Sequence, residues 1–97
     1  MINILVTIEV KDFNLFATFE RKALEIMRSH GGDIIRAFET HRNDDGSGQE
    51  IHLLEFPNDR DFSDYRANPL LLVHSDLREK AIKSTSVVTS IELKNYI

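Results

Sequence analysis

Residues 2–10, INILVTIEV, alternate between aliphatic and mostly polar side chains, which is the period-two pattern of a β-strand with one buried face. Immediately afterwards, residues 13–29 gather their apolar side chains on one half of a helix. Asp12 is a suitable N-cap, and Gly31 and Gly32 end the helix because glycine tolerates the left-handed conformation found there. The chain therefore opens with a half-buried strand and an amphipathic helix.

The rest of the chain predicts a hairpin, a helical region and a closing strand. Residues 33–42 and 50–56 form the hairpin around a turn-rich loop. Residues 59–67 and 69–83 are expected to be helical, and residues 86–96 are rich in Val, Thr and Ile, as strands are. The order βαββαβ predicts an α+β, ferredoxin-like fold: a four-stranded antiparallel sheet with the helices on one face.

Composition and charge limit the classes of function. The chain has 97 residues, with 12 Lys and Arg against 16 Asp and Glu, and we expect one domain over residues 1–97. The acidic balance argues against a nucleic-acid partner, and no apolar run reaches the ~18 residues of a membrane span. Because the chain has no cysteine and no visible signal peptide, disulfides and Cys-ligated zinc are excluded and we expect a cytoplasmic protein.

Strand parity divides the sheet into a helix-covered face and a helix-free face. A hairpin loop centred on Gly46 and Ser47 places His41 opposite His52. The helix-free face then combines apolar and charged side chains, which are Leu5, Thr7, Glu9, Ile34, Arg36, Phe38, Ile51, Leu53, Glu55 and Glu92. Such a patch marks an interaction site, and the two outer strands leave open edges. We therefore expect a homodimer that covers this face and encloses a small cavity.

Short motifs along the chain resemble the domain-of-unknown-function 1330 family. They are Val10-Lys11-Asp12, Phe16 and Phe19, His30-Gly31-Gly32, Glu55-Phe56-Pro57, Phe62-Ser63-Asp64-Tyr65, Asn68-Pro69 and Leu77-Arg78-Glu79-Lys80-Ala81. Each motif is weak alone, but together they span nearly the whole chain in a specific order. The resemblance implies a dimeric α+β barrel, from a superfamily of small cofactor-free monooxygenases, isomerases and many proteins of unknown role.

The first candidate site consists of charged residues on the helix-free face. Parity places Arg36, Glu55 and Glu9 there, with Arg36 diagonal to Glu55 across the hairpin. A carboxylate in a half-buried cavity has a raised pKa, which suits Glu55 as proton acceptor, with Glu9 in reserve. Arg36 would bind an anionic substrate oxygen. The alternative is a structural ion pair within a half-polar interface.

A second group lies in the part of the chain that resembles the family. Tyr65 and Arg78, with His74 near them in sequence, can roof one end of the cavity. Arg78 can clamp a ligand carboxylate with two hydrogen bonds, because its guanidinium is a planar fork. The alternative is that Arg78 belongs to the solvated charged run of residues 78–80.

Two further features have weaker functional readings. If His41 faces His52, Glu39 on the same face could complete a metal site, although the spacing favours two solvated histidines. Glu20 is the only charge on the apolar half of the first helix. Because it lies near the edge of the apolar stripe, we expect its carboxylate to extend into solvent.

Two functions fit these observations. The leading one is a small homodimeric α+β barrel that binds a small organic molecule and can act as a cofactor-independent enzyme, through proton transfer or oxygen chemistry. The alternative is a non-catalytic ligand-binding or structural dimer. A cavity of ~300 Å³ or more would favour the first function.

Overall fold

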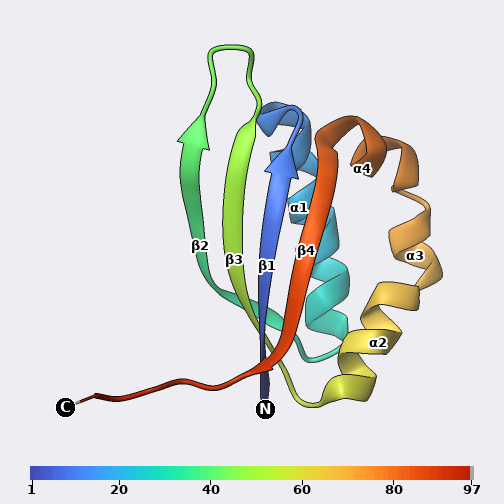
Figure 1. The fold of residues 1–97 in the computed structure, drawn as a ribbon. Helices are drawn as coiled ribbons and strands as arrows, with labels where there is room; N and C mark the ends of the chain where they lie inside the picture. Colours follow the sequence, from blue (N-terminus) through green and yellow to red (C-terminus); the bar gives the residue numbers. More distant parts are fainter. Residues whose placement is uncertain (97) are drawn as a thin grey trace.

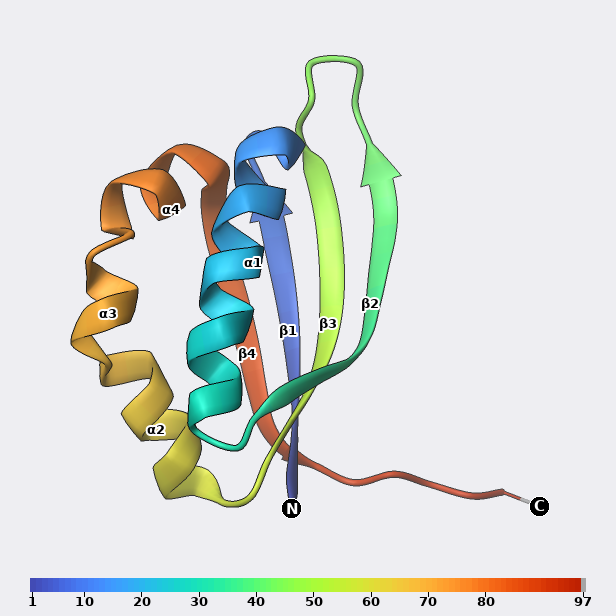
Figure 2. The same ribbon diagram turned by 180° about the vertical axis from the view of Figure 1, so that it is seen from behind.

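The computed structural model describes residues 1–96 and forms a four-stranded antiparallel sheet with every described helix on one face (Figures 1 and 2). The elements are β1 (Ile2–Val10), α1 (Phe13–Ser29), β2 (Asp33–Arg42), β3 (Gly48–Phe56), α2 (Asp59–Ala67), α3 (Pro69–Leu72), α4 (Ser75–Ala81) and β4 (Ile82–Ile91). The strand order β2-β3-β1-β4 makes β2 and β4 the edges. The predicted α+β ferredoxin-like fold is confirmed. None of the helices described is long and apolar enough to cross a membrane.

Helix α1 has the bounds that the sequence predicts, because local interactions fix both of its ends. The side chain of Asp12 accepts hydrogen bonds from the backbone N–H groups of Asn14 and Leu15, at 2.9 and 3.1 Å. These two donors have no partner within the helix. After the helix, Gly31 adopts a φ of +78°, which favours glycine. The apolar face of α1 is thereby held against the sheet.

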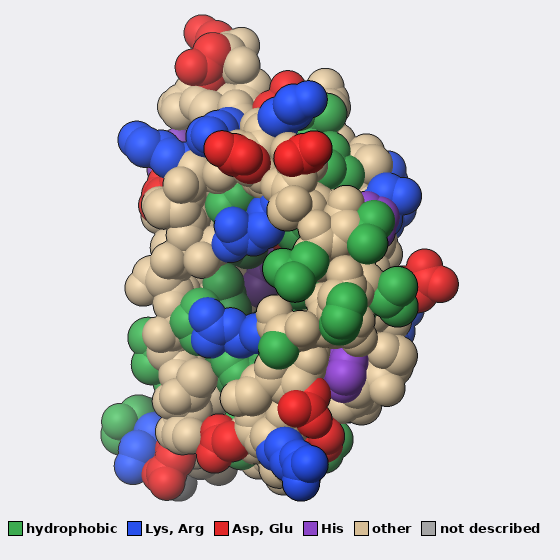
Figure 3. All heavy atoms as spheres, turned by 90° about the vertical axis from the view of Figure 1, so that its right-hand side faces the viewer, with side chains coloured by type: hydrophobic (Ala, Val, Ile, Leu, Met, Phe, Trp, Pro, Cys, Tyr) green, Lys and Arg blue, Asp and Glu red, His purple; other side chains and the backbone are tan. Residues whose placement is uncertain are grey.

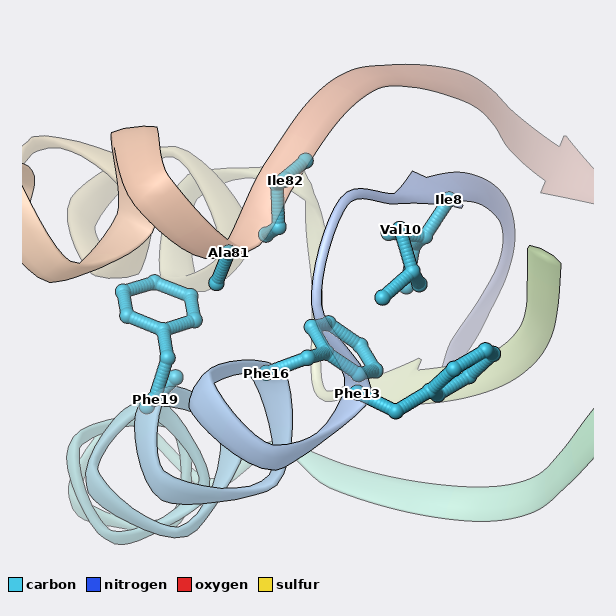
Figure 4. Packing of buried hydrophobic residues seen from close by; sticks show 8 residues of the cluster. Ile8, Val10, Phe13, Phe16, Phe19, Ala81 and Ile82 are labelled. Carbon is cyan, nitrogen blue, oxygen red and sulfur yellow. The ribbon is translucent and has the colours of Figure 1, made fainter. Parts of the chain in front are cut away.

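The core lies between α1 and the sheet and is divided into two clusters. In the first, aromatic side chains of α1 point toward β1 and toward the junction of α4 and β4 (Figure 4). Its buried members are Ile8, Val10, Phe13, Phe16, Phe19, Ala23, Ala81 and Ile82. The second cluster consists of Ile4, Met27, Leu54, Phe56 and Phe62. Val6 is half-buried and packs against both clusters.

The hairpin register differs from the prediction. The loop is centred on Asp45, so Arg42 pairs with Gly48 and His41 with Gln49, and β2 is also irregular. Its pairing with β3 shifts between Ile34 and Arg36, and again between Glu39 and His41. Each shift adds a residue to one strand, which changes the face of the residues that follow. Ala37 is therefore the partner of His52, and the predicted pairing of His41 with His52 is wrong.

Two members of the predicted helix-free face are also misplaced. Ile34 pairs with Leu54 and packs against the second core cluster, so it belongs to the covered face. Glu92 lies beyond the end of β4, which stops at Ile91 instead of reaching residue 96. Strand β4 also begins earlier than expected, at Ile82, so the second helical region ends at Ala81.

The helix-free face otherwise carries the residues that parity predicts. Leu5 pairs with Leu53 on one side and with Val88 on the other, and Phe38 pairs with Ile51. No described element covers this face, and Phe38 and Val88 are 55% and 50% exposed. This surface, made of Leu5, Phe38, Ile51, Leu53 and Val88 with their polar neighbours, is called the open face below.

Candidate functional site

A pocket of about 750 Å³ lies between the sheet and the helical layer. Helices α2, α3 and α4 form an arc that leaves the sheet and returns at the start of β4 (Figure 2). Viewed from that side, the surface is hollowed, with a histidine recessed among hydrophobic side chains (Figure 3). The apolar wall includes Phe19, Met27, Leu54, Phe62 and Ile82, contributed by the four elements α1, β3, α2 and β4. The core is therefore incomplete on this side of α1.

His52 is the buried polar side chain in this wall. It is 4% exposed and belongs to β3, on the same face as Glu50, because residues two apart in a strand share a face. Its Nε2 is 2.9 Å from Glu50 Oε1, and its Nδ1 is 3.9 Å from Glu20 Oε2. The second distance is longer than a hydrogen bond. His52 therefore sits between two carboxyl groups, one in direct contact and one at a greater distance.

Glu20 reaches the pocket from α1. Only 21% of its side chain is exposed, so the expectation that it extends into solvent is wrong. Burial raises the pKa of the Glu20 carboxyl above 4.5, and the nearby Glu50 raises it further, whereas His52 and Arg78 act in the opposite direction. The side chain of Glu20 extends from α1 toward His52 on the sheet. This direction is set by how α1 packs on the sheet, and helical periodicity alone does not predict it. The pocket thus holds a carboxyl group that retains its proton more readily than usual.

Tyr65 and Arg78 line the same pocket, so the structure brings two of the predicted site residues together. The ring of Tyr65 packs on Phe56, with 5.6 Å between centroids. Burial raises the pKa of the Tyr65 phenol far above its ordinary value, and Glu20 adds to this effect. The phenol is therefore a neutral hydroxyl at physiological pH. Arg78 lies on the exposed side of α4, at the pocket opening.

The other predicted site residues lie on the open face, across the sheet from the pocket. Glu9 accepts a hydrogen bond from Gln49 Nε2 at 2.7 Å. Arg36 is diagonal to Glu55 as expected, since it pairs with Leu53, but its Nη1 donates to a backbone carbonyl. No ion pair joins Arg36 to Glu55 in the part of the chain that the structure describes. The open-face group and the pocket are two separate candidate sites.

The proximity of Glu20 to His52 was not predicted from the sequence. Two signals pointed to it: a lone carboxylate in an apolar helical stripe, and a histidine that alternates with Leu54 and Phe56 on a buried strand face. Neither signal locates the other residue, because 32 positions of sequence separate them. Within residues 1–96, no cluster of His, Asp and Glu has the arrangement of a metal site.

Comparisons with known proteins establish the fold. No protein-family model and no curated protein matches the chain, so the resemblance to the domain-of-unknown-function 1330 family is not confirmed. Solved structures do match, at identities that show the fold alone.

Three of these structures illustrate the match. A protein of unknown function from Rhodopseudomonas palustris is 14% identical, with a TM-score of 0.75, over 97% of this chain and 83% of that chain. SnoaB, a cofactor-independent oxygenase from Streptomyces nogalater, is 10% identical, with a TM-score of 0.71, over 98% and 95%. A NIPSNAP family protein of unknown function from Agrobacterium tumefaciens is 19% identical, with a TM-score of 0.67, over 92% and 85%.

Proposed function

We propose that this protein binds a small organic molecule in the pocket between α1, the sheet and α2–α4, and that Glu20 and His52 form its proton-accepting pair. The observation that carries the proposal is the buried His52, with the mostly buried Glu20 beside it, among the apolar side chains of the inner pocket wall. A volume of about 750 Å³ lies within the range of about 300–1,000 Å³ found for small-molecule sites. Such sites combine an apolar wall with a few polar groups, as this one does.

The polar pair gives the pocket a chemical capacity. Glu20 as a carboxylate can accept a proton from an acidic C–H or O–H bond of the ligand, which leaves the bonding electrons on the ligand. Its raised pKa makes it a stronger base than an exposed carboxylate. A cofactor-independent oxygenase is among the proteins that share this fold, which supports a reaction that needs no cofactor.

His52 provides a route by which the proton can leave the pocket. Its two ring nitrogens face Glu20 and Glu50. A proton accepted by Glu20 can pass to Nδ1 when the 3.9 Å gap between them closes to a hydrogen bond, while Nε2 gives its proton to Glu50. Glu50 and His52 also line a smaller depression on the other side of α1, of about 260 Å³. Because this depression opens to solvent, the proton taken from the ligand has an exit that does not cross the occupied pocket.

The open face supports the second part of the proposal, assembly as a homodimer. Its exposed apolar side chains are arranged on one surface, between two edge strands, and a second copy presents the same surface. In that arrangement Arg36, Glu55 and Glu9 would lie between two sheets. A cavity between the sheets is the second candidate site, with Glu55 or Glu9 as base and Arg36 as anion-binding group.

A ligand screen tests both sites at once. A thermal-shift screen of small acids, phenols and lactones should find compounds that stabilise the protein, since a ligand at 100 times its Kd contributes about 2.7 kcal/mol. NMR spectra of the labelled full chain then locate each compound. We expect perturbed amide signals around Glu20, His52 and Tyr65. Signals perturbed only around Arg36 and Glu55 would assign binding to the open face, and a screen without hits would contradict the binding function.

A further inference from the structure

Basic side chains surround the opening of the pocket. Lys11, Arg66, Arg78 and Lys83 line it and are all exposed, and the one carboxylate among the exposed lining residues is Glu79. The whole chain has the opposite balance, with a formal net charge of −4. Figure 3 shows Lys and Arg side chains beside the hollow. The pocket opening is therefore a basic region on an acidic protein.

Two of these cations are engaged within the protein and two are not. Lys11 Nζ donates a hydrogen bond to the backbone carbonyl of Glu79 at 2.9 Å. The guanidinium of Arg66 lies 5.3 Å from the ring centroid of Phe62. In contrast, the side chains of Arg78 and Lys83 make no hydrogen bond or ion pair with any other described residue. Arg78 acts on Glu20 through its charge alone, so the hydrogen-bond donors of both Arg78 and Lys83 are available to a ligand.

We propose that the ligand is a small organic monoanion with an apolar, ring-sized body, whose acidic group is bound by Arg78 with support from Lys83. This inference rests on the proposed pocket function and names the class of its ligand. A carboxylate accepts two parallel hydrogen bonds from a guanidinium, which a point charge cannot provide. The apolar body then lies against Phe19, Met27 and Leu54, inside the opening.

The position of Glu20 fixes the orientation of this ligand. Glu20 lies inside the pocket and senses the charge of Arg78 at the opening. A second anionic group on the ligand would face this carboxylate and be repelled, whereas a neutral C–H or O–H group can donate its proton to it. The ligand therefore carries its negative charge at one end only, and that end faces the solvent.

Three probes with one ring system separate charge from shape. They are 2-naphthoate, 2-naphthamide and 2-naphthylmethylammonium, titrated into the full-length protein and followed by NMR. We expect naphthoate to bind at least about tenfold more tightly than the neutral amide, which is about 1.4 kcal/mol, and the ammonium probe to bind most weakly. The preference for naphthoate should shrink in about 1 M salt, where the Debye length is about 3 Å.

Variants of α4 assign the preference to one residue. Arg78→Gln should lower naphthoate affinity to that of the amide and leave amide affinity unchanged, and Arg78→Lys should restore only part of the loss. Lys80→Gln is the matched control, because it removes the same charge from an exposed position of α4 that does not line the pocket. Equal losses in both Gln variants would show a general charge effect and overturn the assignment to Arg78.

The failure of this inference is distinguishable from failure of the pocket function. If the amide, or neutral compounds from the screen, bind in the pocket as tightly as their acidic counterparts, the anion proposal is wrong and the pocket function stands. If neither the probes nor the screen gives a ligand that perturbs the pocket signals, both are wrong.

Discussion

The two faces of the sheet are built from the same strands but are completed in different ways. On the covered face, Ile4 and Ile8 of β1 are almost fully buried by helices of the same chain. On the open face, Phe38 and Val88 remain half exposed, and no described element covers them. This difference indicates which face carries the candidate site. Polar groups are ordinary on the open face, whereas on the covered face His52 and the mostly buried Glu20 lie among buried apolar side chains.

The largest difference between the faces should appear when an aromatic side chain is truncated on each. Phe16→Ala removes a side chain that is 2% exposed and should lower the free energy of unfolding by about 3–5 kcal/mol. Phe38→Ala should cost less, and its cost should grow with protein concentration, because association stabilises the folded state by mass action. Chemical denaturation at several protein concentrations measures both effects. A Phe38→Ala cost that does not depend on concentration would contradict the dimer.

A charge on the open face should separate the two copies. Phe38→Asp would bury an uncompensated carboxylate at the centre of the proposed interface, so we expect a monomer or insoluble protein where the wild type is a dimer. Light scattering at micromolar concentration measures the mass. Val73→Asp is the matched control, since Val73 is also an exposed aliphatic residue but lies between α3 and α4, away from the open face. A wild-type protein that is already monomeric would refute the proposed assembly.

Loss of the α1 cap should have a smaller effect, of a different kind. Asp12→Ala removes the acceptor for two backbone N–H groups and should lower stability by about 1 kcal/mol. Because α1 covers its face within one chain, this cost should be the same at every protein concentration, unlike that of Phe38→Ala. Chemical denaturation checks this, and Asp12→Asn, which keeps a capping acceptor, should restore most of the stability.

The contrast between the faces also explains how far the sequence could predict the structure. The bounds of α1 and the choice of which face of β1 is buried are local properties, and both were predicted correctly. Asp12 and Gly31 set the ends of the helix, and the alternation of aliphatic residues sets the buried face of the strand. The irregularities of β2 arise from its pairing with β3, and no glycine or other residue typical of a bulge lies beside Ile34 to predict them. The predicted histidine pair does not form because the loop is centred on Asp45, which pairs His41 with Gln49 next to the loop.

The residues of the candidate site also differ in how far local sequence patterns predict them. Tyr65 and Arg78 were predicted as ligand-binding residues and do line one pocket, although that role stays a prediction. The roles of Arg36, Glu55 and Glu9 also stay predictions, tied to an interface that one chain cannot complete. Glu20 was placed correctly on the helix edge but assigned to solvent, because helical periodicity gives an angle and not the partner across the core. Nonlocal packing therefore decides the chemistry that local patterns leave open.

The smallest effect we predict concerns the charge state of Glu20. Its raised pKa distinguishes this carboxyl group on the covered face from exposed carboxyl groups. An acid whose pKa is raised by folding binds its proton more tightly in the folded state, so stability falls as the pH rises from the unfolded pKa through the folded one. Glu20→Gln cannot ionise and should escape this loss, although His52, Glu50 and Arg78 still face the position.

The Tm of Glu20→Gln minus that of the wild type should therefore become more positive as the pH is raised from about 4 to about 7. Thermal unfolding across this pH range measures the difference. Glu25→Gln, an exposed position on the same helix, is the control and should give a difference that is nearly flat with pH. A flat difference for Glu20→Gln as well would mean that His52 and Arg78 fully compensate the burial of the carboxylate. Glu20 would then have the basicity of an ordinary surface acid, and the covered face would hold no base stronger than those of the open face.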